Sequence, residues 1–247
     1  EPKWMLLSYH KTAYASSSRS GFDPQNAFDE SIKSAWSASR GNSGEWLSVD
    51  LGKEYNVEAV QVNFADCFTK KKRAPIKEYG GTFTQERYIE EELVRYEYRI
   101  EYSSNGTDWI TYGEIQNTVF PHKLIPCRAM ARYIRIVFAS APYGQNFSIS
   151  GLRVFGLGGD EKPSAVSGEK AERTSVTEAK LSWNSQNDAM GYCIRLGIAP
   201  DKLYNSILLY GQNDYTVTFL NKETEKYYFA VDSFNESGIT KGSINEF

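Results

Sequence analysis

One stretch, from Gly44 to Gly52, limits the fold of this chain more than any other. In its interior Leu47, Val49 and Leu51 alternate with residues of mixed polarity. Period-two alternation is typical of a β-strand that buries one face, and a glycine at each end is typical of a turn. The stretch therefore predicts a half-buried strand within a sheet.

The same alternation recurs along the whole chain. It is found at residues 57–64, 95–102, 132–136, 149–156, 179–183, 192–196, 215–219 and 227–231. Short alternating runs separated by turn residues predict antiparallel β-sandwiches, so we expect an all-β chain. The pair Asn105-Gly106 further predicts a tight two-residue turn of type I′, with Trp109 opening the return strand.

A family resemblance rests on several motifs that follow one another in order. They are P-x-N-A-F-D-E at residues 24–30, S-x-W-S at 34–37, G-E-W-L-x-V-D-L-G at 44–52 and Y-x-I-E-Y-S-x-N-G-x-x-W at 98–109. Over residues 12–157 the chain resembles the discoidin (coagulation factor 5/8 type C) domain. This resemblance implies an eight-stranded jelly-roll β-sandwich. In bacterial polysaccharide-degrading enzymes such domains often resemble family 32 carbohydrate-binding modules.

A glycine-rich break at Gly156–Pro163 predicts a boundary between two domains. We expect the first domain at residues 1–157, a linker at 158–162 and the second domain at 163–247. The order L-S-W, G-Y-x-I-R and Y-Y-F-A-V-D-S-F-N-E-S-G in the second resembles a fibronectin type III domain, which implies an immunoglobulin-like β-sandwich. It also implies a corner tyrosine at Tyr227 or Tyr228.

Charge and hydropathy argue against two classes of partner. The net charge of −3 gives no broad attraction to nucleic acid or to an anionic membrane surface. No apolar run approaches the ~18–20 residues of a membrane span, so we expect no membrane insertion. The insertion at residues 65–94 carries a basic run, Lys70–Arg73, and an acidic end, Glu90–Glu92. A solvated loop with balanced charges is the preferred interpretation, and a nucleic-acid patch is the alternative.

The three cysteines, Cys67, Cys127 and Cys193, are widely spaced. Such spacing predicts neither a zinc site nor a dense disulfide framework. We expect free thiols, with a single disulfide between Cys67 and Cys127 as the alternative.

No pattern in the sequence predicts a catalytic site. Glycoside hydrolysis needs two opposed carboxyl groups, and the chain isolates no such pair. With only two histidines, His10 and His122, a histidine-based metal site or triad is hard to assemble. We therefore expect no catalytic residues.

The whole chain is similar to the C-terminal portion of bacterial family 43 glycoside hydrolases described as xylosidases or arabinosidases. The phrases W-M-L-L-S-Y and N-F-S-I-S-G-L-R-V-F-G carry this similarity. Those enzymes hold their catalytic carboxylates on a separate propeller domain. The similarity implies a non-catalytic accessory region beside an upstream catalytic domain of the same parent chain. It also implies a secreted, periplasmic or cell-surface location in a bacterium.

The discoidin resemblance implies a structural calcium ion in the loop Ala27–Ser34. Asp29 is expected to supply a carboxylate oxygen, Ser34 a hydroxyl and a carbonyl oxygen, and Ala27 a carbonyl oxygen, since calcium takes six to eight oxygen ligands. The chain departs from the family at Gly151, where a glutamate ligand is usual. An ammonium group from Lys33 in place of the ion is the alternative.

The resemblance also implies a carbohydrate site formed by loops at one end of the sandwich. Sugars need an aromatic face for their C–H side and fixed polar groups for their hydroxyls. The candidate residues are Arg40, Asn42, Tyr79, Tyr143, Gln145 and Asn146. Tyr79 lies in the long insertion, where it is expected to form a wall or lid. Trp36 is assigned to the core.

A second interpretation stays open: a structural module that packs against a catalytic domain and binds no sugar. Protein or lipid binding, as in some animal discoidin domains, is a third. Exposed aromatic residues at one loop end favour sugar binding, whereas a large apolar patch on a sheet face favours docking.

Overall fold

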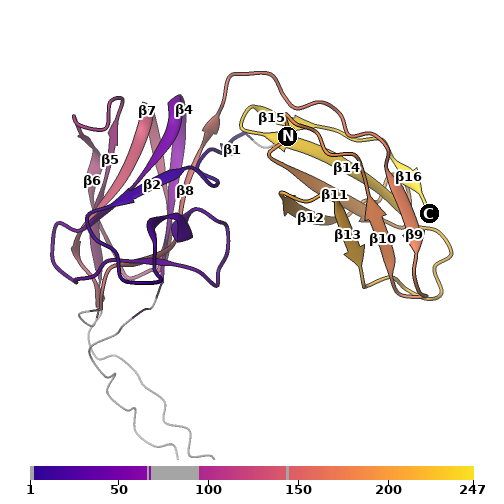
Figure 1. The fold of residues 1–247 in the computed structure, drawn as a ribbon, viewed down its shortest axis with the longest axis horizontal. Coiled ribbons are helices and arrows are strands. Elements are labelled where there is room, and N and C mark those ends of the chain that lie inside the picture. The colour runs from indigo at the N-terminus through magenta and orange to yellow at the C-terminus, as the bar shows by residue number, and fades with distance from the viewer. Residues whose placement is uncertain (1–2, 66, 68–94, 143–144) are drawn as a thin grey trace, which may run out of the picture. The chain divides into compact units, whose positions relative to one another are not determined.

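The computed structural model of the 247-residue chain describes residues 3–65, 67, 95–142 and 145–247. The chain divides into two compact units. The first is Leu6–Gly156, and the second is Leu157–Phe247 together with Glu1–Met5. Figure 1 shows that both are built from strands, which confirms the all-β prediction. Among the described residues, no helix has the length and hydropathy of a membrane span.

Eight strands form one hydrogen-bonded sheet, which belongs to the first unit except for its end residues Met5 and Leu157. They are β1 (Met5–Leu6), β2 (Thr12–Ala15), β3 (Trp36–Ser37), β4 (Trp46–Phe64), β5 (Tyr96–Ser103), β6 (Ile110–Thr118), β7 (His122–Ser140) and β8 (Ser148–Leu157), with a 3-10 helix η1 at Pro24–Ala27. The order is β1-β8-β4-β7-β5-β6, with β2 on β4 and β3 on β8. Neighbours such as β4 and β7 are antiparallel.

Two long strands, β4 and β7, fold this sheet into a sandwich. Their pairing runs without a break from Trp46 to Asp50 and resumes at Tyr55 after an irregularity. Gly52 lies in that interval with a φ of +92°, a conformation that favours glycine. The strand predicted around Gly44–Gly52 and the one predicted at 57–64 are therefore two halves of one bent strand.

The core of the first unit lies between the two layers. Its members from β4 are fully buried on both sides of the bend: Leu47, Val49, Leu51, Val57, Val60 and Val62. Trp36 is also fully buried, so its assignment to the core is confirmed. A domain of this size can bury a core that needs no disulfide to be stable.

The cysteines fit this description. No disulfide joins Cys67, Cys127 and Cys193, all three of which the structure describes, so the alternative Cys67–Cys127 pairing is not found. Burial raises the pKa of Cys127 to about 12, which keeps it a protonated thiol.

The predicted two-residue turn at Asn105-Gly106 is wrong. The strands end at Ser103 and resume at Ile110, one residue after Trp109. The side-chain oxygen of Asn105 accepts hydrogen bonds from the backbone N–H groups of Thr107 and Asp108, two and three residues further on, both at 2.9 Å. These local hydrogen bonds compete with the hydrogen bonds between the two strands, so the connection is longer than two residues.

The second unit contains two sheets. One has the order β13-β10-β9, from β9 (Lys170–Arg173), β10 (Ala179–Ser182) and β13 (Asp214–Val217). The other has the order β12-β11-β14-β15 with β16 on β14, from β11 (Gly191–Gly197), β12 (Asn205–Tyr210), β14 (Tyr228–Asn235), β15 (Gly238–Thr240) and β16 (Asn245–Glu246). Trp183 and Tyr192 pack edge to face in the core between them, with ring centroids 5.3 Å apart.

Two hydrogen-bonded features hold the second unit together. Asn221 donates its backbone N–H to the hydroxyl of Tyr227 at 2.7 Å, the geometry of a tyrosine corner. The predicted linker is also tied to this unit, because Gly158 and Asp160 bond to Glu236 and Ser237 at 2.8 and 3.0 Å.

One buried carboxylate, Asp232, lies on β14 with about 1% of its side chain exposed. Arg195 donates to both of its oxygens at 2.8 and 2.9 Å, and Lys241 and the N–H of Gly242 donate at 2.8 and 3.0 Å. Burial alone raises the pKa of Asp232, but these donors outweigh it and the pKa lies below its usual value.

Candidate functional site

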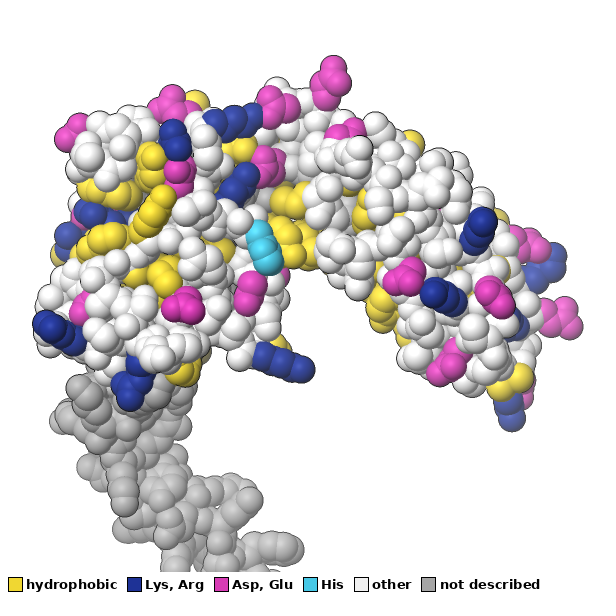
Figure 2. Space-filling model, in the orientation of Figure 1, with side chains coloured by type: hydrophobic (Ala, Val, Ile, Leu, Met, Phe, Trp, Pro, Cys, Tyr) yellow, Lys and Arg dark blue, Asp and Glu magenta, His cyan; other side chains and the backbone are white. Residues whose placement is uncertain are grey.

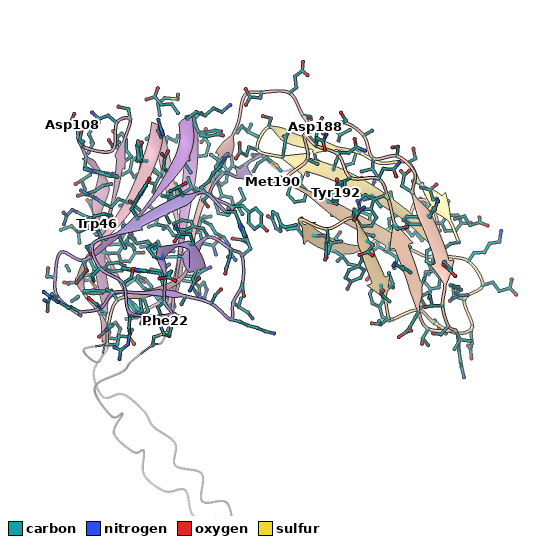
Figure 3. All side chains as sticks on the ribbon, in the orientation of Figure 1. Phe22, Trp46, Asp108, Asp188, Met190 and Tyr192 are labelled. Carbon is teal, nitrogen blue, oxygen red and sulfur yellow. The ribbon has the colours of Figure 1, made fainter. Side chains whose placement is uncertain are left out.

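Several connections meet at one end of the first unit. The backbone N–H of Ala38 donates to Phe147 at 2.9 Å, that of Phe64 to Pro121 at 2.7 Å, and that of Ala65 to Ser148 at 3.0 Å. We call this region, residues 38–45, 119–121, 141–142 and 145–147, the loop end. Figure 1 shows it at the lower end of the unit. Phe22, which is labelled in Figure 3, marks the same end, and its carbonyl accepts the N–H of Ser37 at 3.2 Å.

Packed aromatic rings form a floor beneath the loop end. The ring centroids of Phe64 and Tyr96 are 4.0 Å apart, and those of Phe138 and Phe147 are 4.5 Å apart. Phe64 also meets Phe138 edge to face at 6.1 Å. Phe147 is only 2% exposed, so it belongs to this floor rather than to a binding surface.

Gln145 and Asn146 do not face solvent, contrary to what a contact with sugar requires. They are 3% and 4% exposed. Asn146 donates to the carbonyl of Ala38 at 2.9 Å, and Gln145 donates to the hydroxyl of Tyr96 at 3.2 Å. Buried amides are held by such bonds. In this structure the pair supports the loop end from below.

Arg40 and Asn42, in contrast, are exposed on the connection between β3 and β4. Their backbone is held in place: Ser39 donates to Ser17 Oγ at 3.1 Å, and a Cβ on Gly41 would lie 3.1 Å from the carbonyl oxygen of Gln145. The loop thus presents a guanidinium and an amide on a supported main chain. The other two candidates, Tyr79 and Tyr143, lie outside the described residues.

An exposed aromatic residue at the loop end was missed by the sequence analysis. Phe120, in the turn between β6 and β7, is 64% exposed. Its N–H donates to Thr118 Oγ1 at 3.1 Å, and the next residue, Pro121, is bonded to Phe64 of the floor. An aromatic residue directly before a proline in a turn between strands, V-F-P-H, is the signal that points to it.

The outer face formed by β2, β4, β5 and β7 carries aromatic rings with charges between them. Arg135 lies over the ring of Trp109 at 3.9 Å and that of Trp46 at 5.7 Å, and it pairs with Glu101. Trp46 is labelled on this face in Figure 3, and Figure 2 shows yellow side chains there mixed with dark blue and magenta ones. The face is therefore not a continuous apolar patch.

Asp50 belongs to the same face. Arg132 Nε and Nη2 donate to its two oxygens at 2.7 and 2.8 Å. The hydrogen bond from Arg132 holds the pKa of Asp50 below its usual value, against the opposing effect of burial. This pairing gives Asp50 a structural role.

The loop expected to bind calcium, with Ala27, Asp29 and Ser34, does not fit that ion. Both oxygens of Asp29 already accept hydrogen bonds, from the N–H of Ser31 and the hydroxyl of Ser34. The described residues contain no group of three or more His, Cys, Asp or Glu side chains that could hold a metal ion. Calcium takes six to eight oxygen ligands, and the one carboxylate expected to bind it here is already engaged within the loop.

The comparisons with known proteins bear on the first unit. Residues 12–88 match the F5/8 type C domain. The match spans β2, η1, β3, β4 and most of the insertion at residues 65–94, so it includes the Gly44–Gly52 stretch. No curated protein matches the chain.

Solved structures similar to this chain include sugar-binding modules. Chitosan-binding module 1 of a chitosanase/glucanase from Paenibacillus sp. IK-5 is 22% identical, with 62% of this chain and 99% of that chain covered and a TM-score of 0.47. The family 32 module of NanJ from C. perfringens, solved with galactose, is 19% identical, with 62% and 98% covered and a TM-score of 0.44. At these values the similarity says nothing of what this chain binds.

Proposed function

We propose that the first unit is a non-catalytic carbohydrate-binding module of the family 32 type and that the loop end is its sugar site. The observation that carries this proposal is the exposure of Phe120, Arg40 and Asn42 at one end of the sandwich, above a floor of stacked rings and buried amides. An exposed ring suits the C–H face of a sugar, and the guanidinium and amide suit its hydroxyls. The F5/8 type C match supports it.

The outer sheet face favours sugar binding over docking to a catalytic domain. The rings of Trp109 and Tyr133 on this face have the guanidinium groups of Arg135 and Arg132 over them at 3.9 and 5.0 Å. Both arginines are paired with carboxylates. A partner would have to desolvate these ion pairs, which is costly.

For the second unit we propose a fibronectin type III-like domain that acts as a spacer. The two sheet orders and the tyrosine corner at Tyr227 support this identity. The whole chain would then be the accessory region of a secreted or cell-surface bacterial glycoside hydrolase. Its role would be to raise the effective concentration of polysaccharide near a catalytic domain of the same parent chain.

A glycan array followed by titration calorimetry tests the proposal. The full chain is applied to an array and then titrated with xylan, arabinoxylan and galactose-terminated oligosaccharides. We expect retention on a restricted set of glycans and saturable heat for at least one of them. A folded protein that shows neither would leave the docking module as the better account.

A further inference from the structure

The loop from Phe28 to Ser34 closes on itself through its own side chains. Asp29 accepts the N–H of Ser31 at 2.9 Å and the hydroxyl of Ser34 at 2.6 Å. Ser31 Oγ in turn accepts the N–H of Lys33 at 3.2 Å. Side chains that bond to backbone N–H groups two residues on form the turns that Asp and Ser favour. Two of the groups expected to ligate calcium, the Asp29 carboxylate and the Ser34 hydroxyl, are used for this closure.

An ion pair fastens the loop to β8. Arg153 Nε lies 2.8 and 3.0 Å from the two carboxylate oxygens of Glu30. The side chains are 24% and 22% exposed, so the pair is largely shielded from water. Glu30 adopts a φ of +59°, a conformation that few non-glycine residues take, and the pair holds it there.

Asn63 on β4 completes the arrangement. With its amide oriented to satisfy its neighbours, its oxygen accepts from Arg153 Nη1 at 2.8 Å. A Cβ on Gly151 would lie 3.1 Å from the terminal amide of Asn63. The amide therefore fills the space in front of Gly151, the position where the family resemblance implies a glutamate ligand.

We infer that Arg153, paired with Glu30 and Asn63, replaces the structural calcium ion in this domain. A guanidinium is always charged, and its planar fork of donors suits a carboxylate and an amide together. A divalent ion beside it would be repelled and would find Asp29 already engaged. The cation is not Lys33, the alternative from the sequence, whose side chain is exposed. The loop is thus closed without metal, whatever the domain binds.

Thermal unfolding and hydrogen exchange of the full chain test this inference. The wild type is measured in EDTA and in millimolar calcium chloride, with exchange followed in the peptide that contains residues 28–36. Glu30→Gln and Arg153→Met are measured alongside. Arg128→Met is the matched control, because Arg128 is 85% exposed and pairs with Glu58 at 3.5 Å.

We expect calcium and EDTA to leave the wild-type Tm and loop exchange unchanged. Glu30→Gln and Arg153→Met should each lower the Tm of the first unit by about 2–6 °C and speed exchange in the loop, while Arg128→Met changes neither. A rise in Tm or slower loop exchange on adding calcium to the wild type would overturn the inference. So would wild-type exchange in both loop variants. Neither readout depends on sugar binding, so failure here is distinct from failure of the proposed function.

Discussion

The loop end and the loop at Phe28–Ser34 lie on the same sandwich. The first exposes polar side chains to solvent, and the second uses them for hydrogen bonds within the protein. At the loop end, buried amides of Gln145 and Asn146 hold the main chain, and Arg40 and Asn42 face solvent. In the other loop, Asp29 and Ser31 bond to the loop itself, and Glu30 bonds to Arg153 on β8. Arg40 and Asn42 are available to a ligand because other groups hold their backbone, whereas Asp29 is not available because it holds its own loop.

The largest expected effect comes from an inward-facing carboxylate. Asp232→Ala leaves Arg195 and Lys241 without their shared partner, although both remain partly exposed. We expect a loss of about 3 kcal/mol in the free energy of unfolding of the second unit, measured by urea denaturation. A loss of less than about 1 kcal/mol, as for an exposed ion pair, would mean that the buried carboxylate of Asp232 does not stabilise this unit.

The same carboxylate predicts how stability depends on pH. Because the pKa of Asp232 is lower in the folded state than its ordinary value of 3.8, the pair contributes fully above 3.8. The contribution is lost as the pH falls from there through the lower folded pKa. The free energy of unfolding of the wild type should therefore fall more steeply with decreasing pH below 3.8. In Asp232→Asn it should depend less on pH in that range. Identical profiles would contradict the assignment.

Asn146→Ala tests whether the buried amides of the loop end stabilise the fold while its exposed residues do not. The substitution leaves the carbonyl of Ala38 without its buried donor. We expect the first unit to lose about 2 kcal/mol of unfolding free energy, measured by chemical denaturation. Asn42→Ala, in the same region, is the matched control and should cost less than about 0.5 kcal/mol. Equal costs would remove the distinction on which the comparison rests.

A smaller effect is expected at the tyrosine corner. Tyr227→Phe keeps the ring in the core and removes only the hydroxyl that accepts from the N–H of Asn221. One hydrogen bond of this kind contributes about 1 kcal/mol. Thermal unfolding of the second unit should register that loss. No change would mean that the corner plays no part in its stability.

Much of the fold could be predicted from the sequence because alternation reports burial directly. Leu47, Val49 and Leu51 are buried as their period predicts, and Trp36 lies in the core. The turn at Asn105-Gly106 was wrong because a side chain can bond locally in a way that a dipeptide pattern does not reveal.

The site was harder to predict because its decisive contacts are long-range. The sequence places Gln145 and Asn146 in a loop and so predicts that they are exposed, yet tertiary packing buries them. Arg153 lies 123 residues from Glu30, so no local pattern joins them. Phe120 is a single aromatic residue in a turn, and only its exposure in the folded structure separates it from the many rings in the core.

The most direct test of the account is a titration of the best glycan from the array into matched variants. Phe120→Ala and Asn42→Ala remove groups of the loop end, and Phe219→Ala removes a Phe that is 52% exposed in the second unit. We expect the first two to weaken binding roughly tenfold or more with unchanged Tm, and the third to bind like the wild type. Wild-type affinity in both loop-end variants would contradict the account, because the sugar would then bind elsewhere.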